Sequence, residues 1–171
     1  MSVFEQELSD RKSSQGVLFQ EKVDSFTRGN ARAAFQHLRQ VLRTSERSGD
    51  QINIAWSLLN IAMVLRGQRQ YATAIQVLEK VKAIFTTTNN EFGLASTLEE
   101  LSYANRELNR NALALEYSHK AVKMFQALNR PLELAWAYDN MAVIFFNLFR
   151  RNESLTYAKK ARAIFLSYRS P

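Results

Sequence analysis

The residues best suited to acid–base or metal chemistry are few and far apart in this sequence. The chain contains no cysteine and only two histidines, His37 and His119, and neither histidine has a carboxylate and a second histidine at metal-ligand spacing. Glu99 and Glu100 are adjacent carboxylates, but neighbouring side chains on a helix point about 100 degrees apart and do not meet at one substrate atom. The sequence therefore predicts no catalytic residue, no metal site and no cofactor, and it argues against an enzyme.

Positive charge is concentrated at the C-terminal end of the chain. The 23 Lys and Arg residues outnumber the 16 Asp and Glu residues, which gives a formal net charge of +7. The basic patch of the last segment comprises Arg150, Arg151, Lys159, Lys160 and Arg162. Such a patch could contact phosphates, but no recognition-helix motif, aromatic stacking platform or glycine-rich phosphate loop accompanies it. We interpret the patch as a solvated face, and a nucleic-acid-associated factor is kept only as an alternative function.

The composition indicates that helices must position any functional side chain. Hydrophobic residues make up 46% of the chain, and only five Gly and two Pro occur, which is typical of a helical protein with a substantial core. The N-terminal residues are polar and acidic, and no apolar stretch approaches the roughly 18 residues of a membrane span. These features predict an all-α, cytoplasmic protein without membrane insertion.

The same apolar pattern recurs every forty residues. Residues 54–62 align without a gap with residues 94–102 and with residues 134–142. Small residues stay in phase with this offset at two positions, which are Ala62, Ser102 and Ala142, and Ala74, Ala114 and Ser154. Within each repeat the apolar residues follow helical spacing in two segments that turn residues separate. Each repeat is therefore predicted to be two antiparallel helices.

This period divides the chain into about four helical hairpins. The predicted repeats cover about residues 14–49, 50–89, 90–129 and 130–168, and the first of them fits the pattern less well. They form a single domain of residues 14–168 behind a flexible tail of residues 1–13. A coiled coil is the structural alternative, but breaks every fifteen to twenty residues argue against it.

Through the small residues at those two positions and the large apolar residues around them, the chain resembles the tetratricopeptide repeat (TPR) family over about residues 14–165. It departs from the common form of roughly 34 residues, because its period is forty, the proline usual at the end of the second helix is absent, and only Tyr71 supplies the aromatic residue usual before the first alanine of that helix. Longer forms of about this period are similar to those in peptide-sensing regulators, kinesin light chains and polarity adaptors. The resemblance implies a right-handed superhelical array, a TPR-like α-solenoid, that binds peptides or proteins in its concave face.

In such an array the first helix of each repeat lines the groove, so residues beside its buried stripe are the candidate contacts. We expect two aromatic ends, Trp56 and Trp136, to flank a polar middle, because aromatic and Arg side chains dominate binding energies and Asn can bond a peptide backbone. Packing of the tryptophans between repeats is the alternative. The predicted groove comprises Phe19, Trp56, Asn60, Met63, Arg66, Glu99, Glu100, Tyr103, Arg106, Trp136, Asp139, Asn140, Val143 and Phe146.

The favoured function is a protein- or peptide-binding adaptor, assembly factor or scaffold, and the alternative reading is the peptide-sensing part of a regulator. The two-carboxylate clamp of the family that the chain resembles needs a set of lysine and asparagine residues on the first helices. Asn60 and Asn140 match it in kind, but no lysine stands beside them, so recognition of a terminal carboxylate is not predicted. The apolar residues expected to face the position of a further repeat are Leu148, Phe149, Ile164 and Leu166. If they form an open patch, we expect a homo-oligomer through the C-terminal repeat or a fragment of a larger protein; screening of the patch by its basic residues is the alternative.

Overall fold

The computed structural model describes residues 31–168, in which every regular element is an α-helix. The helices are α3 (Ala31–Ser48), α4 (Gln51–Gly67), α5 (Tyr71–Thr87), α6 (Glu91–Glu107), α7 (Asn111–Ala127), α8 (Pro131–Asn147) and α9 (Arg151–Ser167). The predicted tail of residues 1–13 and the groove residue Phe19 lie outside the described residues. None of the described helices is both long and apolar enough to cross a membrane.

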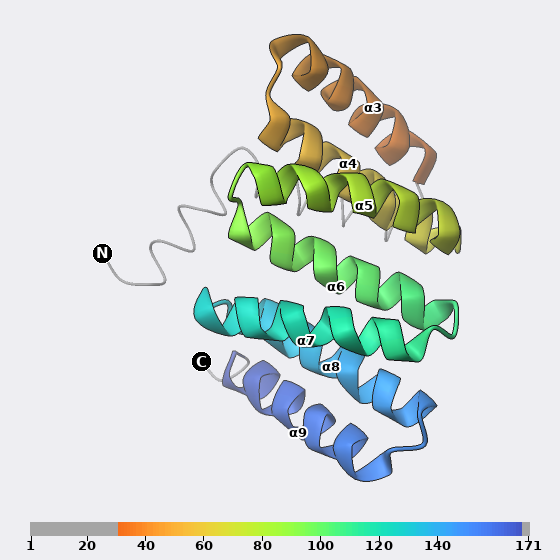
Figure 1. Ribbon diagram of the computed structural model, residues 1–171, viewed down its shortest axis with the longest axis vertical. Coiled ribbons are helices and arrows are strands. Elements are labelled where there is room, and N and C mark those ends of the chain that lie inside the picture. Colours follow the sequence, from red (N-terminus) through yellow and green to blue (C-terminus); the bar gives the residue numbers. More distant parts are fainter. Residues whose placement is uncertain (1–30, 169–171) are drawn as a thin grey trace.

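The helices form a twisted stack in which consecutive helices run antiparallel, from α3 at one end to α9 at the other (Figure 1). The closest pairs are α4 with α5, α6 with α7 and α8 with α9, and the first helices of these pairs also contact each other in the order α4, α6, α8. The predicted all-α array of helix pairs is thereby confirmed. The side of α4, α6 and α8 turned away from the second helices is called the inner wall below.

One turn geometry recurs at every joint between helices. A residue with positive φ occurs every twenty residues, at Gly49, Arg69, Asn89, Asn109, Asn129 and Phe149. The backbone N–H of the next residue then donates to the carbonyl five positions back, as in the 3.0 Å bond from Asn90 to Phe85. This left-handed cap ends a helix and satisfies its last carbonyls. Because the joints are alike and every helix from α4 to α9 has 17 residues, each pair advances by forty residues.

The core lies between helix pairs as much as within them. Leu101 of α6 belongs to a buried cluster with Leu78 and Phe85 of α5, whereas Leu98 of the same helix belongs to the next cluster, with Phe125 of α7. The small residues that the sequence predicted where two helices approach closely, such as Ala74 and Ala114, are fully buried. Each pair therefore buries apolar surface of its neighbours, which is how repeat arrays gain stability.

Replacing Gly93 by Ala is expected to destabilise the fold although Ala is the better helix former. A Cβ at Gly93 would lie 2.6 Å from the ring of Phe85, which is fully buried and has no room to move away. We expect the free energy of unfolding in urea to fall by about 1 to 2 kcal/mol, since overpacking outweighs the gain of roughly 1 kcal/mol in helix propensity. Gly93→Ala combined with Phe85→Leu should recover part of the loss. A gain in stability for the single variant would contradict this packing.

Replacing Phe149 by Asn is expected to stabilise the fold. Phe149 has φ of 59° and its side chain is 88% exposed, so a bulky residue occupies a left-handed position without compensating burial. Asn tolerates this conformation, as it does at the equivalent joints, and the free energy of unfolding should rise by about 1 kcal/mol. The reverse change, Asn129→Phe, should lower it. Equal urea midpoints for Phe149→Asn and the unsubstituted chain would contradict the explanation.

Candidate partner-binding site

One side chain per repeat forms a column along the inner wall. Met63 of α4, Tyr103 of α6 and Val143 of α8 are separated by forty residues each, and all three are partly or fully open to solvent. They follow one another because α4, α6 and α8 lie in contact in that order. The column therefore offers an apolar and aromatic track across three successive repeats.

Two guanidinium groups fix the middle of this track. The Arg66 and Arg106 guanidinium carbons lie 4.5 Å and 4.2 Å from the centroid of the Tyr103 ring. A cation at this distance from an aromatic ring is attracted by its π electrons. The ring is thus held in place before any ligand arrives, which lowers the entropic cost of binding to it.

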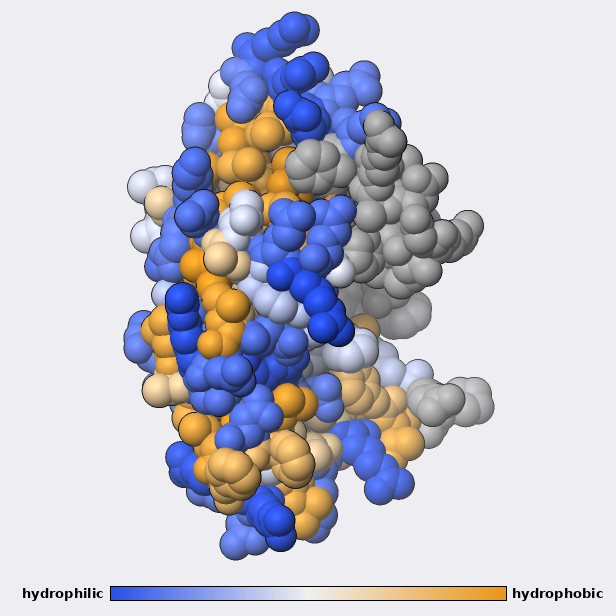
Figure 2. Space-filling model, turned by 90° about the vertical axis from the view of Figure 1, so that its right-hand side faces the viewer, coloured by the Kyte–Doolittle hydropathy of each residue, from blue (hydrophilic) through white to orange (hydrophobic). Residues whose placement is uncertain are grey.

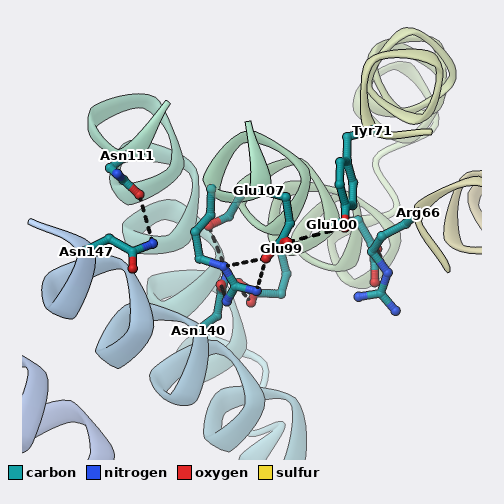
Figure 3. A network of polar contacts seen from close by, with 10 residues as sticks. Arg66, Tyr71, Glu99, Glu100, Glu107, Asn111, Asn140 and Asn147 are labelled. Atoms are coloured by element: carbon teal, nitrogen blue, oxygen red, sulfur yellow. Dashed lines mark hydrogen bonds and ion pairs between the residues drawn. The ribbon is translucent and has the colours of Figure 1, made fainter. Parts of the chain in front are cut away.

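Polar contacts join consecutive first helices at a constant offset. Arg66 Nε lies 3.4 Å from Glu100 Oε2, and forty residues later Arg106 Nη1 donates to Asn140 Oδ1. A second set joins a second helix to the next first helix and repeats with the same forty-residue offset: Tyr71 of α5 donates its hydroxyl to Glu107 of α6 at 3.3 Å, and Asn147 of α8 donates its amide to Asn111 of α7 at 3.4 Å. Figure 3 shows both sets as a ladder that crosses from one helix pair to the next. The ladder fixes the register of the stack.

Glu99 is a partly buried acidic member of the ladder. Asn140 Nδ2 donates to Glu99 Oε1 at 2.8 Å and to Ser102 Oγ at 3.0 Å. Burial raises the pKa of Glu99 to about 7, while the Asn140 hydrogen bond and the Arg106 charge oppose the increase. Burial likewise raises the pKa of Glu100, against the opposing charge of Arg66. Both carboxylates therefore sit where ionisation is costly.

Several residues of the predicted groove serve the stack instead of facing solvent. Asn60, Arg106 and Asn140 are buried, and Asn60 donates its amide to the Trp56 carbonyl at 2.9 Å. The expectation that these amide and charged groups stay open on the groove face is wrong: Arg106 and Asn140 bond to each other between α6 and α8, and Asn60 bonds back to its own helix.

Trp56 and Trp136 differ although they occupy equivalent positions. Trp56 is partly buried and packs against Phe85, with ring centroids 5.0 Å apart, and against Phe92 at 5.8 Å. It therefore fits the alternative reading of packing between repeats. Trp136 packs edge-on against Phe165 at 5.0 Å but is 63% exposed. Asp139 and Phe146 beside it on α8 are exposed as well.

Sequence reasoning missed six polar members of the ladder, which are Tyr71, Ser102, Glu107, Asn111, Ser118 and Asn147. Ser118 among them donates its hydroxyl to Glu99 Oε2, at 3.5 Å. A signal for one contact was present, because Tyr71 and Glu107 precede Asn111 and Asn147 by forty residues. Applying the offset to pairs of polar residues, and not only to single positions, would have suggested this contact.

Two residues of the predicted basic patch, Arg150 and Lys160, contact other side chains of the chain. Arg150 pairs with Glu153 and lies 4.7 Å from the Phe145 ring centroid, and Lys160 lies 4.9 Å from the Tyr157 ring centroid. All five residues of the patch are exposed. Of the residues expected to face a further repeat, Phe149 and Leu166 are exposed and Leu148 and Ile164 are partly buried. No group of three or more His, Asp or Glu side chains in residues 31–168 could hold a metal ion.

Comparisons with known proteins agree with this architecture. Two family models, both described as tetratricopeptide repeat, match residues 25–87 and 134–165. The structure of BtubC (BKLC) from P. vanneervenii is 16% identical with a TM-score of 0.71, over 96% of this chain and 74% of that chain. A Podosopora anserina protein described as a kinesin light chain with nearly identical TPR-like repeats is 17% identical with a TM-score of 0.68, over 95% and 77%. At these identities the likeness concerns the fold alone, and no curated protein matches the chain.

Replacing Glu99 by Gln is expected to remove a pH dependence of stability. The pKa of Glu99 is about 7 in the folded chain, against an ordinary value of 4.5, so the folded state binds more protons than the unfolded state between these values. The free energy of unfolding of the unsubstituted protein should therefore fall as the pH rises through that interval. Gln keeps the oxygen that accepts from Asn140 but does not ionise.

Glu99→Gln should accordingly be more stable than the unsubstituted protein at about pH 8, by about 2 kcal/mol, and nearly equal to it at about pH 4.5. Urea denaturation followed by circular dichroism across this range measures both. Glu116→Gln is the matched control, because Glu116 is exposed and pairs only with Lys120. If the free energies of unfolding of Glu99→Gln and of the unsubstituted protein change with pH in parallel, ionisation of Glu99 does not destabilise the fold.

Proposed function

The chain belongs to the tetratricopeptide repeat family, and from this premise we propose that it is a non-catalytic, cytoplasmic adaptor that holds a peptide segment of another protein against the inner wall. The observation that carries the proposal is the column of Met63, Tyr103 and Val143, with the Tyr103 ring fixed by two guanidinium groups. A segment that runs along the stack meets an apolar side chain on α4 and on α8 and, between them, a tyrosine ring held by two guanidinium groups. Binding of this kind rests on a few large side chains and a preorganised surface.

The expected ligand is a segment with apolar side chains at intervals, because the wall presents its apolar groups one per repeat. The polar ladder leaves few charged groups free beside the column: Arg66 and Arg106 are engaged with Glu100, Glu107 and Asn140. Charge alone would therefore select a partner weakly at the centre of the wall. No contact among the described residues favours the peptide-sensing alternative.

A double substitution on the column tests this proposal. Met63→Glu with Val143→Glu places two carboxylates on the apolar track, and desolvating them opposes the binding of an apolar segment. Affinity capture from the source organism's lysate, quantified by mass spectrometry, should recover the wild-type partner at least about tenfold less with this variant.

Leu113→Glu is the control for this capture, because Leu113 is an exposed apolar residue on α7, outside the inner wall. It should leave recovery unchanged. If the double variant loses helicity, Val143→Glu alone is tested in the same capture, because Val143 is the more exposed of the two positions and its substitution should leave the fold intact. Equal recovery by folded wall variants and wild type would refute binding along the column.

A further inference from the structure

The end of the stack formed by α8 and α9 exposes positions that are covered elsewhere in the array. In α4, Trp56 contacts Phe92 and Arg66 contacts Glu100, and both partners belong to the next first helix, α6. In α8, the equivalents of these two positions are Trp136 and Phe146, which are 63% and 66% exposed. Within residues 31–168 no helix covers α8 in the way that α6 covers α4.

The interior of the array shows what a covering helix must present. Phe92 of α6 places its ring against Trp56. Gly93, the next residue, lies so close to the Phe85 ring that a Cβ does not fit. Eight residues after Phe92, Glu100 meets Arg66, and the equivalent residue Asn140 meets both Arg106 and Glu99. The helix that covers a tryptophan, α6, thus uses an aromatic residue, a small residue and a polar residue at fixed spacing. The helix α8 covers Ser96 in place of a tryptophan and has Leu132 and Glu133 at the first two positions. Because α8 itself presents Trp136, the pattern of α6 is the one that applies to its covering helix.

At the end of the stack the residues that would receive the aromatic and the small residue have close equivalents, and the residue that would receive the polar one is changed. Trp136 and Phe165 stand where Trp56 and Phe85 stand in the interior, and pack edge-on with the same 5.0 Å separation. The arginine of the interior is replaced by Phe146, and Asp139 takes the position of Glu99. The polar residue of a covering helix would meet an aromatic ring in place of the interior guanidinium, together with a carboxylate. A Lys or Arg suits both, through its apolar stem, its attraction to the ring and its charge.

We propose that α8 and α9 form a docking surface for one helix of a partner protein, which carries an aromatic residue, a small residue directly after it, and Lys or Arg eight positions after the aromatic. Figure 2 shows hydrophobic residues reaching the surface at the lower end of the molecule, where α8 and α9 lie. Phe149, strained and exposed at the α8–α9 joint, adds an apolar edge to the same end; strain of this kind is often kept at functional sites.

A second copy of the chain fits this surface less well. No aromatic residue in the sequence that is followed by Gly, Ala or Ser has Lys or Arg eight positions after it; Phe92, for example, is followed at that distance by Glu100. Placing Glu100 of another copy against Asp139 would bring two carboxylates together. A second copy of the chain, which the sequence suggested, is therefore expected to bind this surface more weakly than the proposed partner helix.

A synthetic peptide with the sequence of α6, residues 91–107, provides the probe. Glu100→Lys in this peptide creates the proposed pattern, and the unsubstituted peptide is its matched control. Both contain no tryptophan. Binding of the Glu100→Lys peptide to the full chain should shift tryptophan emission to shorter wavelength, and Trp136→Phe should abolish most of the shift. Its dissociation constant, from fluorescence anisotropy at low salt, should be about fivefold lower than that of the unsubstituted peptide.

Three variants of the protein decide where the peptide binds. Asp139→Lys should reverse the preference between the two peptides, and Phe146→Glu should weaken the Glu100→Lys peptide about tenfold. Both residues are exposed, so folding should be retained. Met63→Glu, on the inner wall, should leave peptide binding unchanged. The Met63→Glu result tests the α8–α9 surface separately from the proposed adaptor groove on the inner wall. Either proposal can therefore be refuted without affecting the other.

Three outcomes would overturn the docking surface. The first is no saturable binding of the Glu100→Lys peptide up to about 1 mM, a limit beyond which specific association contributes little. The second is loss of peptide binding in Met63→Glu with retention in Phe146→Glu, which would place the peptide on the inner wall. The third is a dimer in sedimentation velocity that Phe146→Glu dissociates, which would make a second copy the occupant.

Discussion

A helix pair of this chain has apolar surface on two sides and buries only part of it by itself. The remainder is covered by the neighbouring pairs, so that α6 contributes Leu101 to one buried cluster and Leu98 to the next. This sharing is possible only if every pair advances by the same step, because a different step would separate the small residues at the close approaches. The left-handed residue at each joint supplies that constancy: it ends each helix at the same place and turns the chain back at the same angle.

The constant step also determines where polar groups can be buried. An arginine on one first helix reaches the same position of the next first helix in each repeat, and so Arg66 finds Glu100 and Arg106 finds Asn140. A buried polar group costs free energy unless it is paired. The ladder therefore favours the native register over a slipped one, and the hydrogen bond from Asn140 to Glu99 is part of it. The same contacts hold Tyr103 in a fixed orientation on the inner wall.

Two surfaces with different roles follow from one repeated pattern. On the inner wall, positions that do not take part in the stack remain open and form the column proposed to hold a peptide. At the α8–α9 end, positions that do take part in the stack are open, and their chemistry differs from the interior at Phe146. A surface shaped to receive a helix, with side chains altered at one contact, can distinguish a partner helix from the helices of the chain itself.

The sequence by itself determined the helices, the forty-residue period and the family, because apolar spacing, small residues and turn residues repeat in phase along the chain. Turn residues also indicated a break near every joint. Gly49, Asn89, Asn109 and Asn129 are residue types that tolerate positive φ, whereas the types of Arg69 and Phe149 gave no sign of it. Only the tertiary structure decided which groove candidates are buried. Helical periodicity gives the direction of a side chain around its own axis, whereas burial depends on where the neighbouring axis crosses. Trp56 and Trp136 point the same way from their helices and pack against equivalent phenylalanines, Phe85 and Phe165. Phe92 covers Trp56, however, and no described residue covers Trp136 in the same way.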